Sequence, residues 1–346
     1  MNYAIILAGG IGSRFWPLST DSKPKQFLSL CSDKPLLLET IRRISGLASK
    51  QNMYIATNKT YKKTIQWCLK NTRMPLKNLL FEPQSKNTLA AIAVLSKKIY
   101  QIDKNAVVVV LPSDHLIKDK RAFQRTIKNA IRIAENNFIV TLGIVPKRAE
   151  GGFGYIKIKD RLKIKNIDAY RVDKFIEKPG LAKAINLIKN KRFYWNSGIF
   201  IFKASKLLEE IEKFIPQTYS IIKKIKNTDD LNKFWPKLPN ISIDYAIMEK
   251  SKSLSLIPLV CGWSDLGSWQ AVEEFVKKDK NGNISQARHL DLGSRNITVW
   301  AKERIIATLG LNNIIIVDTK DALLVCSKNR VQDVKKIVQK LKQKNL

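Results

Sequence analysis

The sequence is poor in the residues that build metal and disulfide sites. Its 346 residues include only two histidines, His115 and His289, which excludes a histidine-rich metal site. The four cysteines lie far apart and show no metal-ligand spacing, as is typical of a reduced, cytoplasmic protein. No apolar run is long enough to span a membrane, and the N-terminus lacks the features of a secretory signal. We therefore predict a cytoplasmic protein without a membrane partner.

Acidic residues are scarce relative to basic ones. The chain has 62 Lys and Arg against 29 Asp and Glu, a formal net charge of +33. Such an excess can indicate a nucleic-acid partner. The lysines are scattered along the whole chain, however, and no basic arm or aromatic-interleaved RNA motif is present. We therefore expect no nucleic-acid partner, whereas an anionic small substrate is compatible with the charge.

The two commonest phosphate-binding motifs are also absent. The G-x-G-x-x-G pattern fails at Phe15, and no glycine is followed by Lys-Ser or Lys-Thr. A short apolar run, Tyr3–Leu7, instead leads into the glycine-rich segment Ala8–Arg14. Glycines allow backbone N–H groups to approach an anion closely. A glycine-rich turn alone can be a simple strand-to-helix connection, but the cations Arg14 and Lys25 favour a phosphate site.

The first 142 residues alternate between short apolar strands and amphipathic helices. This alternation predicts an α/β fold with a Rossmann-like, mostly parallel sheet flanked by helices. Ligands of such sheets bind at the carboxyl ends of the strands, where Gly9, Gly10 and residues 112–115 fall. The expected strands are Tyr3–Leu7, Met53–Ala56, Leu79–Phe81, Ala106–Leu111 and Phe138–Leu142, and the expected helices are Leu36–Leu47, Lys59–Lys70, Thr88–Tyr100 and Arg121–Glu135.

The pattern changes after Gly143. Further strands are expected at Tyr170–Ile176, Phe193–Phe202 and Leu254–Leu259, and helices at Ser205–Phe214, Ser242–Lys250 and Trp269–Lys277. From about Gln286 the chain consists of short apolar runs, Ile297–Trp300, Ile305–Leu309, Ile314–Val317 and Ala322–Cys326, before a terminal helix over Val331–Leu341. These runs predict a small β-rich module that resembles a short β-helix. We predict a main domain over residues 1–285 and this module with its helix over 286–346.

Two carboxylates follow predicted strands. Asp114 comes directly after the run Ala106–Leu111, within Pro112-Ser113-Asp114, and Asp265 follows the strand Leu254–Leu259. Carboxylates at such positions commonly bind a metal or substrate, although a turn or a helix cap is the alternative. Two carboxylates without histidine partners suit a hard divalent ion, and Mg²⁺ is the ion we expect.

Three further stretches place amide or charged groups at predicted strand ends. Asn87 and Thr88 open a predicted helix, where Asn87 either caps the helix or contacts a ligand. Glu177 and Lys178 lie in Glu-Lys-Pro, and Asn196 lies in Trp-Asn-Ser-Gly. These groups can bind hydroxyls and a phosphate, although each stretch taken singly is equally compatible with a surface turn.

Taken together, the motifs resemble those of the sugar nucleotidyltransferases, and specifically the mannose-1-phosphate guanylyltransferases (GDP-mannose pyrophosphorylases). The resemblance covers nearly the whole chain, with small departures at Ile11 and Phe15. Bifunctional members carry a further phosphomannose isomerase domain; since this sequence ends at Leu346, we expect that activity to be absent. The matching runs are residues 7–19, 24–27, 82–88, 112–115, 177–179, 195–198, 242–245 and 262–265.

The resemblance implies a Mg²⁺-assisted reaction of GTP with mannose 1-phosphate that yields GDP-mannose and pyrophosphate by in-line attack on the α-phosphorus. It implies that Arg14 and Lys25 are catalytic, and that Asp114 and Asp265 bind the metal. The sugar phosphate would be bound by Gly154, Glu177, Lys178 and Asn196. The nucleotide would be bound by Leu7, Ala8, Gly9, Gly10, Gly12, Ser13, Arg14, Lys25, Asn87, Thr88, Pro112, Ser113 and Asp114.

Other functions stay open at this point. One is the same chemistry with another sugar 1-phosphate or nucleotide. Another is a non-catalytic, nucleotide-sugar-binding regulatory subunit, which is disfavoured because Arg14, Lys25, Asp114 and Asp265 are all present. A nucleic-acid-binding protein is suggested by the net charge alone. A homodimer also stays open as the assembly of the chain.

Overall fold

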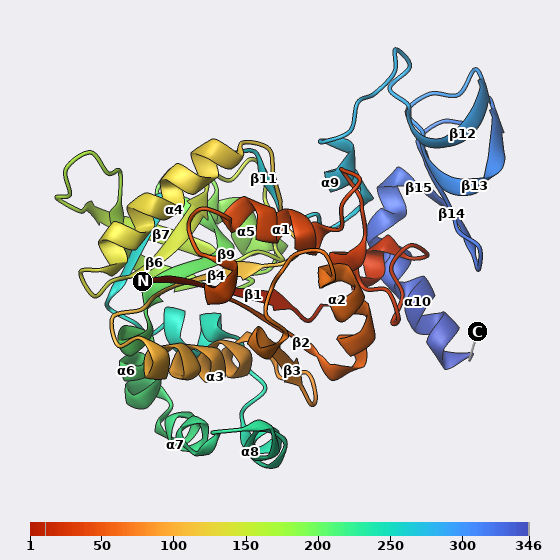
Figure 1. Cartoon of the computed structure of the whole chain (residues 1–346). Coiled ribbons are helices and arrows are strands. Elements are labelled where there is room, and N and C mark those ends of the chain that lie inside the picture. The colour runs from red at the N-terminus through yellow and green to blue at the C-terminus, as the bar shows by residue number, and fades with distance from the viewer. Residues whose placement is uncertain (11, 345–346) are drawn as a thin grey trace. The chain divides into compact units, whose positions relative to one another are not determined.

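The chain forms two compact units, each assembled from separate stretches of sequence. The computed structural model describes residues 1–10 and 12–344, so the departure noted at Ile11 lies outside the described residues (Figure 1). One unit contains residues 1–9, 40–113 and 117–263; the other contains residues 10–39, 114–116 and 264–346. The opening glycine loop thus passes from one unit to the other after Gly9. The boundary expected at 285/286 is a division along the sequence and stays a prediction.

A nine-stranded sheet forms the first unit, in the order β3-β2-β1-β4-β9-β6-β10-β8-β7. Strands β1 to β4 pair in parallel, and β6 pairs in parallel with β10, whereas β8 and β9 run against their neighbours. The mostly parallel sheet is therefore confirmed, with two reversed strands. The strands are β1 (Asn2–Ala8), β2 (Met53–Asn58), β3 (Leu79–Glu82), β4 (Val107–Pro112), β6 (Ile139–Ile144), β7 (Tyr155–Arg161), β8 (Tyr170–Ile176), β9 (Phe193–Lys203) and β10 (Leu254–Pro258).

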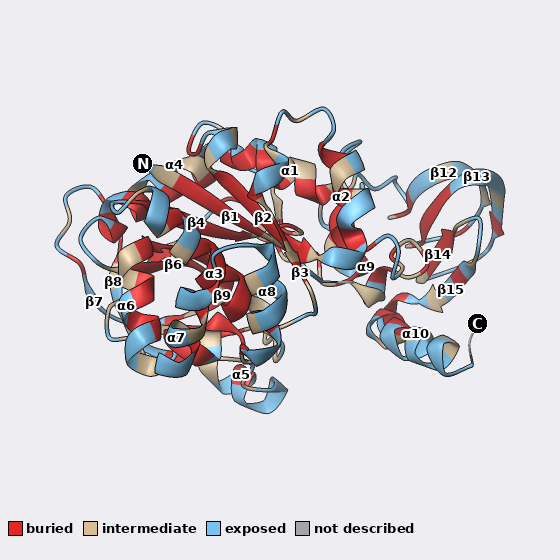
Figure 2. Cartoon of the chain, turned by 60° about the horizontal axis from the view of Figure 1, so that its bottom comes forward, coloured by how far each residue is buried: buried red, intermediate tan, exposed pale blue. Residues whose placement is uncertain are grey.

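The helices cover the sheet with apolar faces. These faces form because apolar residues recur with helical spacing. Helix α3 packs Leu89, Ile92 and Ile99 into the main core, and strands β1, β2 and β4 are correspondingly buried (Figure 2). Asp119 starts α4 by accepting a hydrogen bond from the Ala122 N–H at 2.9 Å. The helices are α1 (Leu36–Ile44), α2 (Lys62–Leu69), α3 (Asn87–Ile102), α4 (Lys120–Ala134), α5 (Leu181–Leu187), α6 (Ala204–Phe214), α7 (Pro216–Lys224), α8 (Thr228–Phe234), α9 (Trp269–Glu273) and α10 (Val334–Gln343).

Several predicted elements differ from the observed ones. The helix expected over Ser242–Lys250 is a single π-helical turn, η7 (Asp244–Met248), and the helix expected over Trp269–Lys277 ends at Glu273. The two strands expected between 297 and 309 are one long strand, β13 (Thr298–Leu309). Helices α5, α7 and α8 were not predicted, because none of them has a long apolar stripe.

The β-rich module belongs to the second unit and has a β-helix-like core. Strands β12 (Ile284–Leu292), β13 and β14 (Ile314–Asp318) pair in parallel, and β15 (Leu323–Ser327) pairs antiparallel with β14. An Asn-Ile pair recurs at the start of each coil, at Asn283, Asn296 and Asn313. The Asn283 Oδ1 accepts from the Ile297 N–H at 3.0 Å, and the Asn296 amide donates to the Asn313 Oδ1 at 3.0 Å. The sequence repeat of this module thus lies in the turns rather than in the strands.

A separate pair of strands, β5 (Leu116–Ile117) and β11 (Trp263–Ser264), forms a two-stranded sheet.

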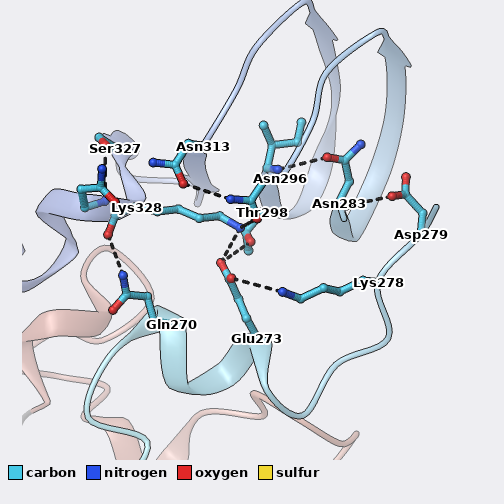
Figure 3. A network of polar contacts seen from close by, with 12 residues as sticks. Gln270, Glu273, Lys278, Asp279, Asn283, Asn296, Thr298, Asn313, Ser327 and Lys328 are labelled. Atoms are coloured by element: carbon cyan, nitrogen blue, oxygen red, sulfur yellow. Dashed lines mark hydrogen bonds and ion pairs between the residues drawn. The ribbon is translucent and has the colours of Figure 1, made fainter. Parts of the chain in front are cut away.

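A buried ion pair joins α9 to this module (Figure 3). The Lys328 Nζ lies 2.8 Å from the Glu273 Oε1, and the Lys328 side chain is 4% exposed. The Thr298 hydroxyl donates to the same carboxylate oxygen at 2.6 Å, and the Lys328 Nζ also donates to the Asn296 Oδ1 at 3.0 Å. Both charges are compensated and hydrogen-bonded, and removing either partner would leave an unpaired buried charge between α9 and the coils.

The structure also bears on the cysteines and on the expectation about membranes. All four cysteines are free, and burial raises the pKa of the Cys31 and Cys68 thiols to about 11. These two thiols are therefore neutral at physiological pH. Among the described residues, every helix is too short or too polar to cross a membrane.

Candidate active site

The second unit contains a polar pocket of about 400 Å³ built around the opening loop. Residues from both ends of the sequence and from its middle surround it, because this unit combines residues 10–39, 114–116 and 264–346. The lining residues are Gly12, Ser13, Arg14, Phe15, Lys25, Asp114, His115, Asp265, Leu266, Gly267 and Lys335. The structure thus brings together the predicted catalytic and metal-binding residues of this unit.

Lys25 is the most constrained cation of this pocket. The residue is 5% exposed, and its Nζ donates to the Asp114 Oδ2 and to the backbone oxygen of Asp265, each at 2.6 Å. Burial favours the neutral form of Asp114, but the charges of Lys25 and His115 outweigh it and lower the pKa of Asp114. The carboxylate is therefore ionised at neutral pH. Lys25 and Asp114 form a preorganised charge pair at the pocket wall.

The loop that carries Arg14 is anchored by packing and by its own turn. Gly12 adopts φ +74°, and the short helix η1 (Ser13–Phe15) follows it. The Phe15 ring packs edge-on against Trp269, with ring centroids 5.3 Å apart. The Arg14 Nη1 donates to the Gly267 backbone oxygen at 3.3 Å. Arg14 lines the pocket, and a guanidinium has further donors that suit an anion.

The carboxylates of this pocket suit a metal that is shared with a substrate. No group of three or more His, Cys, Asp or Glu side chains able to hold a metal occurs among residues 1–10 and 12–344. Asp114 and Asp265 nevertheless line the same pocket. Mg²⁺ is usually bound through one or two carboxylates together with substrate phosphates and water, rather than in an all-protein cage. The two aspartates fit that mode of binding.

The other predicted nucleotide contacts lie at strand ends of the first unit. Leu7 pairs with Pro112 across the parallel strands β1 and β4, and the Ser113 N–H donates to the Leu7 oxygen at 3.0 Å. Ala8 ends β1 and Gly9 follows it, and the Ala8 oxygen accepts from the Thr57 hydroxyl at 2.8 Å. These residues therefore share one edge of the sheet, as predicted, while their contact with a nucleotide stays a prediction.

Asn87 and Thr88 open helix α3 in the same unit. Asn87 adopts φ +57°, and its Oδ1 accepts from the Thr88 N–H at 3.0 Å, which is a local contact of the helix start. The Thr88 Oγ1 accepts from the Ile243 N–H at 3.0 Å and so ties α3 to the turn before η7. Both residues have a structural role, and their ligand role stays a prediction.

The four predicted sugar-phosphate residues lie together in the first unit. A β-carbon at Gly154 would stand 2.6 Å from the Glu177 Oε2 and 3.1 Å from the Asn196 Cβ. The Lys178 Nζ lies 2.9 Å from the Glu177 Oε1. Burial disfavours the charged Lys178, but its hydrogen bond to Glu177 and that residue's charge prevail and raise the Lys178 pKa. The set combines a carboxylate, an amide and a cation around a glycine, which suits a sugar phosphate.

Sequence reasoning missed three residues near these sites. Asp244 begins the π turn and Glu249 follows it. The Asn196 Nδ2 donates to the Asp244 Oδ1 at 2.8 Å, and the Glu177 N–H donates to the Glu249 Oε1 at 3.0 Å. The run Ser242–Tyr245 was recognised as a motif without an assigned role. In the second unit, Lys335 of α10 lines the polar pocket. Nothing in the amphipathic pattern of α10 marks Lys335 among its other lysines.

Comparisons with known proteins agree with this arrangement. A family model described as nucleotidyl transferase matches residues 3–282, and one described as MannoseP isomerase/GMP-like beta-helix domain matches residues 287–341. The chain is 39% identical to the mannose-1-phosphate guanylyltransferase of Salmonella montevideo, over 99% of this chain and 74% of that protein. It is 36% identical to the alginate biosynthesis protein AlgA of Pseudomonas aeruginosa, over 97% of this chain and 71% of that protein.

A solved structure supports the same relationship. The crystal structure described as mannose-1-phosphate geranyltransferase from Thermus thermophilus matches with a TM-score of 0.89 and 30% sequence identity, and the match covers 99% of both chains. Similarity of this extent includes both the large sheet and the β-rich module. The chain therefore belongs to the nucleotidyl transferase family and, within it, to the mannose-1-phosphate guanylyltransferases.

Proposed function

We propose that this chain makes GDP-mannose and pyrophosphate from GTP and α-D-mannose 1-phosphate. The 39% identical relative from Salmonella montevideo supports this choice of reaction, since its name describes it. The observation that carries the proposal is the position of Lys25, held between the Asp114 carboxylate and the Asp265 backbone oxygen in the pocket that Arg14 lines. A buried, fixed cation beside a second cation suits a triphosphate.

The reaction joins two polyanions, so its main barrier is electrostatic. Arg14 and Lys25 would hold the triphosphate and stabilise the charge that develops on the leaving pyrophosphate. Lys178 would bind the sugar phosphate, whose oxygen attacks the α-phosphorus in line. Asp114 and Asp265 would hold Mg²⁺, which supplies charge neutralisation on the phosphates when bound. No covalent intermediate is required.

A matched pair of variants tests the role of the pocket. Lys25→Met keeps the volume of the side chain and removes its charge, so we expect kcat to fall about 10²–10³-fold, as when a preorganised transition-state donor is lost. Lys23→Met changes an exposed lysine two residues away and should leave kcat near the wild-type value. Both are measured by pyrophosphate release, with the fold checked by circular dichroism. A folded Lys25→Met enzyme of wild-type rate would overturn the proposed role of Lys25.

The substrate pair is tested by the same assay with other nucleotides and sugars. We expect GTP with mannose 1-phosphate to give the highest kcat/KM among ATP, CTP, UTP and GTP combined with mannose 1-phosphate or glucose 1-phosphate. A higher value for another pair would favour the related reaction, and no turnover with any pair would favour a regulatory subunit.

For Asp265→Asn we expect a higher Mg²⁺ concentration at half-maximal rate than for the wild type. A cytoplasmic location and a homodimer stay predictions.

A further inference from the structure

The sugar-phosphate residues of the first unit contain an unsatisfied buried acceptor. The Glu177 side chain is 7% exposed, and its Oε2 is buried and has no hydrogen-bond partner in the described part of the chain. The other oxygen, Oε1, lies 2.9 Å from the Lys178 Nζ. Leaving a buried acceptor without a donor costs about 1–3 kcal/mol, so such an atom calls for an explanation. A ligand hydroxyl would satisfy it.

A second carboxylate, Asp244, lies near this acceptor and is hydrogen-bonded to Asn196. The Asn196 amide donates to the Asp244 Oδ1 at 2.8 Å, and its own Oδ1 accepts from the Gly198 N–H at 3.0 Å. Glu177 is close enough to Asp244 for its charge to act on the Asp244 carboxyl. Asn196 is therefore oriented by Asp244, and the two carboxylates share one small region.

The backbone of the η7 turn holds this arrangement in place. Asp244 begins the π-helical turn, and Glu249 follows its end and accepts from the Glu177 N–H at 3.0 Å. The turn thus binds Asn196 through its first residue and Glu177 through the residue after its last. π-helical turns are rare and occur frequently at functional sites.

We propose that Asp244 is a sugar-binding residue that accepts a hydrogen bond from a hydroxyl of the sugar 1-phosphate. The neighbouring hydroxyl of the sugar would donate its hydrogen bond to Glu177. This inference rests on the proposed function, and it adds a specificity-determining residue to the site. The two carboxylates would recognise neighbouring hydroxyls of a hexose, while Lys178 binds the phosphate. Gly154 supports the arrangement, because any side chain at this position would occupy the space next to the Glu177 Oε2.

The chemistry of Asp244 argues against a purely structural role. Burial and the charge of Glu177 raise the pKa of Asp244 to about 6, so that keeping it ionised at neutral pH costs folding free energy relative to the unfolded chain. An asparagine could accept the same hydrogen bond from Asn196 without that cost. A carboxylate at this position is therefore poorly suited to holding Asn196 alone. Ionised, it is a stronger acceptor for a sugar hydroxyl than an amide oxygen would be.

The substitution Asp244→Asn tests the proposal. We expect KM for mannose 1-phosphate to rise at least tenfold, KM for GTP to stay within twofold of wild type, and the melting temperature at pH 7.5 to be equal or higher. Asp229→Asn changes an exposed aspartate of α8 and should leave both KM values unchanged. An unchanged KM for mannose 1-phosphate would overturn the proposal. So would a lowered melting temperature accompanied by equal rises in both KM values, since that pattern marks a structural role.

The pH dependence provides a second readout. The charged neighbours of Asp244 are Glu177 and Lys178, and Glu249 lies at the far end of the turn. We expect wild-type kcat/KM for the sugar phosphate to rise as pH increases through about 6, and this rise to be reduced in Asp244→Asn. An identical profile in both enzymes would contradict the proposal. If the wild type instead uses another sugar 1-phosphate, the proposed function fails, and Asp244 is tested with that sugar in the same way.

Discussion

Gly12 lies directly against Lys25, so that a β-carbon at Gly12 would stand 2.4 Å from the Lys25 Cβ. Gly12 also adopts φ +74°, a conformation that favours glycine. The tight turn of the opening loop and the position of the buried lysine are therefore one structural feature. The glycine is required here for space as well as for backbone conformation.

Replacing Gly12 by alanine is expected to displace Lys25 from Asp114 and the Asp265 oxygen. We expect Gly12→Ala to reduce kcat at least tenfold and to lower stability by about 1–3 kcal/mol, the usual cost of a strained backbone conformation. Gly46→Ala is a matched control, because Gly46 has φ +90° but nothing within 4 Å of an added β-carbon. It should lose stability and retain turnover. Equal loss of turnover in the two folded variants would contradict the prediction.

Lys335 of the terminal helix α10 lines the polar pocket of the second unit. We expect Lys335→Ala to weaken triphosphate binding by about 1 kcal/mol, which is the upper end of the range for an exposed charge pair. This loss corresponds to a KM for GTP that is raised about fivefold. Lys340→Ala on the same helix is the control, since Lys340 is exposed and does not line the pocket. Steady-state kinetics at low and at high salt should show a smaller salt dependence of this KM in Lys335→Ala. No change in KM for GTP would exclude a contact between Lys335 and the triphosphate.

Gly154 is expected to control access to the sugar subsite. A β-carbon there would meet the Glu177 Oε2 at 2.6 Å, and Glu177 is fixed by Lys178 and by Glu249. We therefore expect Gly154→Ala to raise KM for mannose 1-phosphate about tenfold, with KM for GTP unchanged. In Gly152→Ala, the nearest atom to the new β-carbon is the flexible end of Glu150 at 3.6 Å, so its kinetics should match those of wild type. Similar kinetic effects of the two substitutions would argue against a sugar contact at Gly154.

Glu82 makes stability depend on pH. The residue is 6% exposed at the end of β3, and burial raises the pKa of its carboxyl to about 7. The folded state therefore holds this proton more tightly than the unfolded state, so the contribution of Glu82 to stability is highest below about pH 4.5 and falls as pH rises to about 7. For Glu82→Gln we expect a gain of about 1–3 kcal/mol at pH 8 and little change at pH 4.5.

Denaturant unfolding at the two pH values measures this effect. Glu135→Gln serves as the control, because Glu135 is exposed and should show no difference between pH 8 and pH 4.5 beyond that of wild type. A Glu82→Gln protein that is less stable at pH 8 would show that the carboxylate has a stabilising partner there.

The periodicity of the sequence was sufficient for most of the large sheet. Strands β1 to β4 and helix α3 were predicted within a few residues, because alternation and helical spacing report burial over neighbouring positions. The π turn at Asp244 was read as an ordinary helix, since a single extra residue in a turn leaves the apolar pattern almost unchanged. Short helices such as α5 were missed because seven residues carry too little of a pattern.

The amino-acid sequence by itself determined the α/β class, the residue types of the phosphate site and the resemblance to the sugar nucleotidyltransferases. Only the tertiary structure decided that Lys25 binds Asp114, 89 positions away, and the backbone of Asp265, 240 positions away. It alone placed Lys335 at the polar pocket and Asp244 beside Asn196. The physical reason is that local patterns record which side of an element is buried. The partner of a buried charge depends on how distant segments pack together.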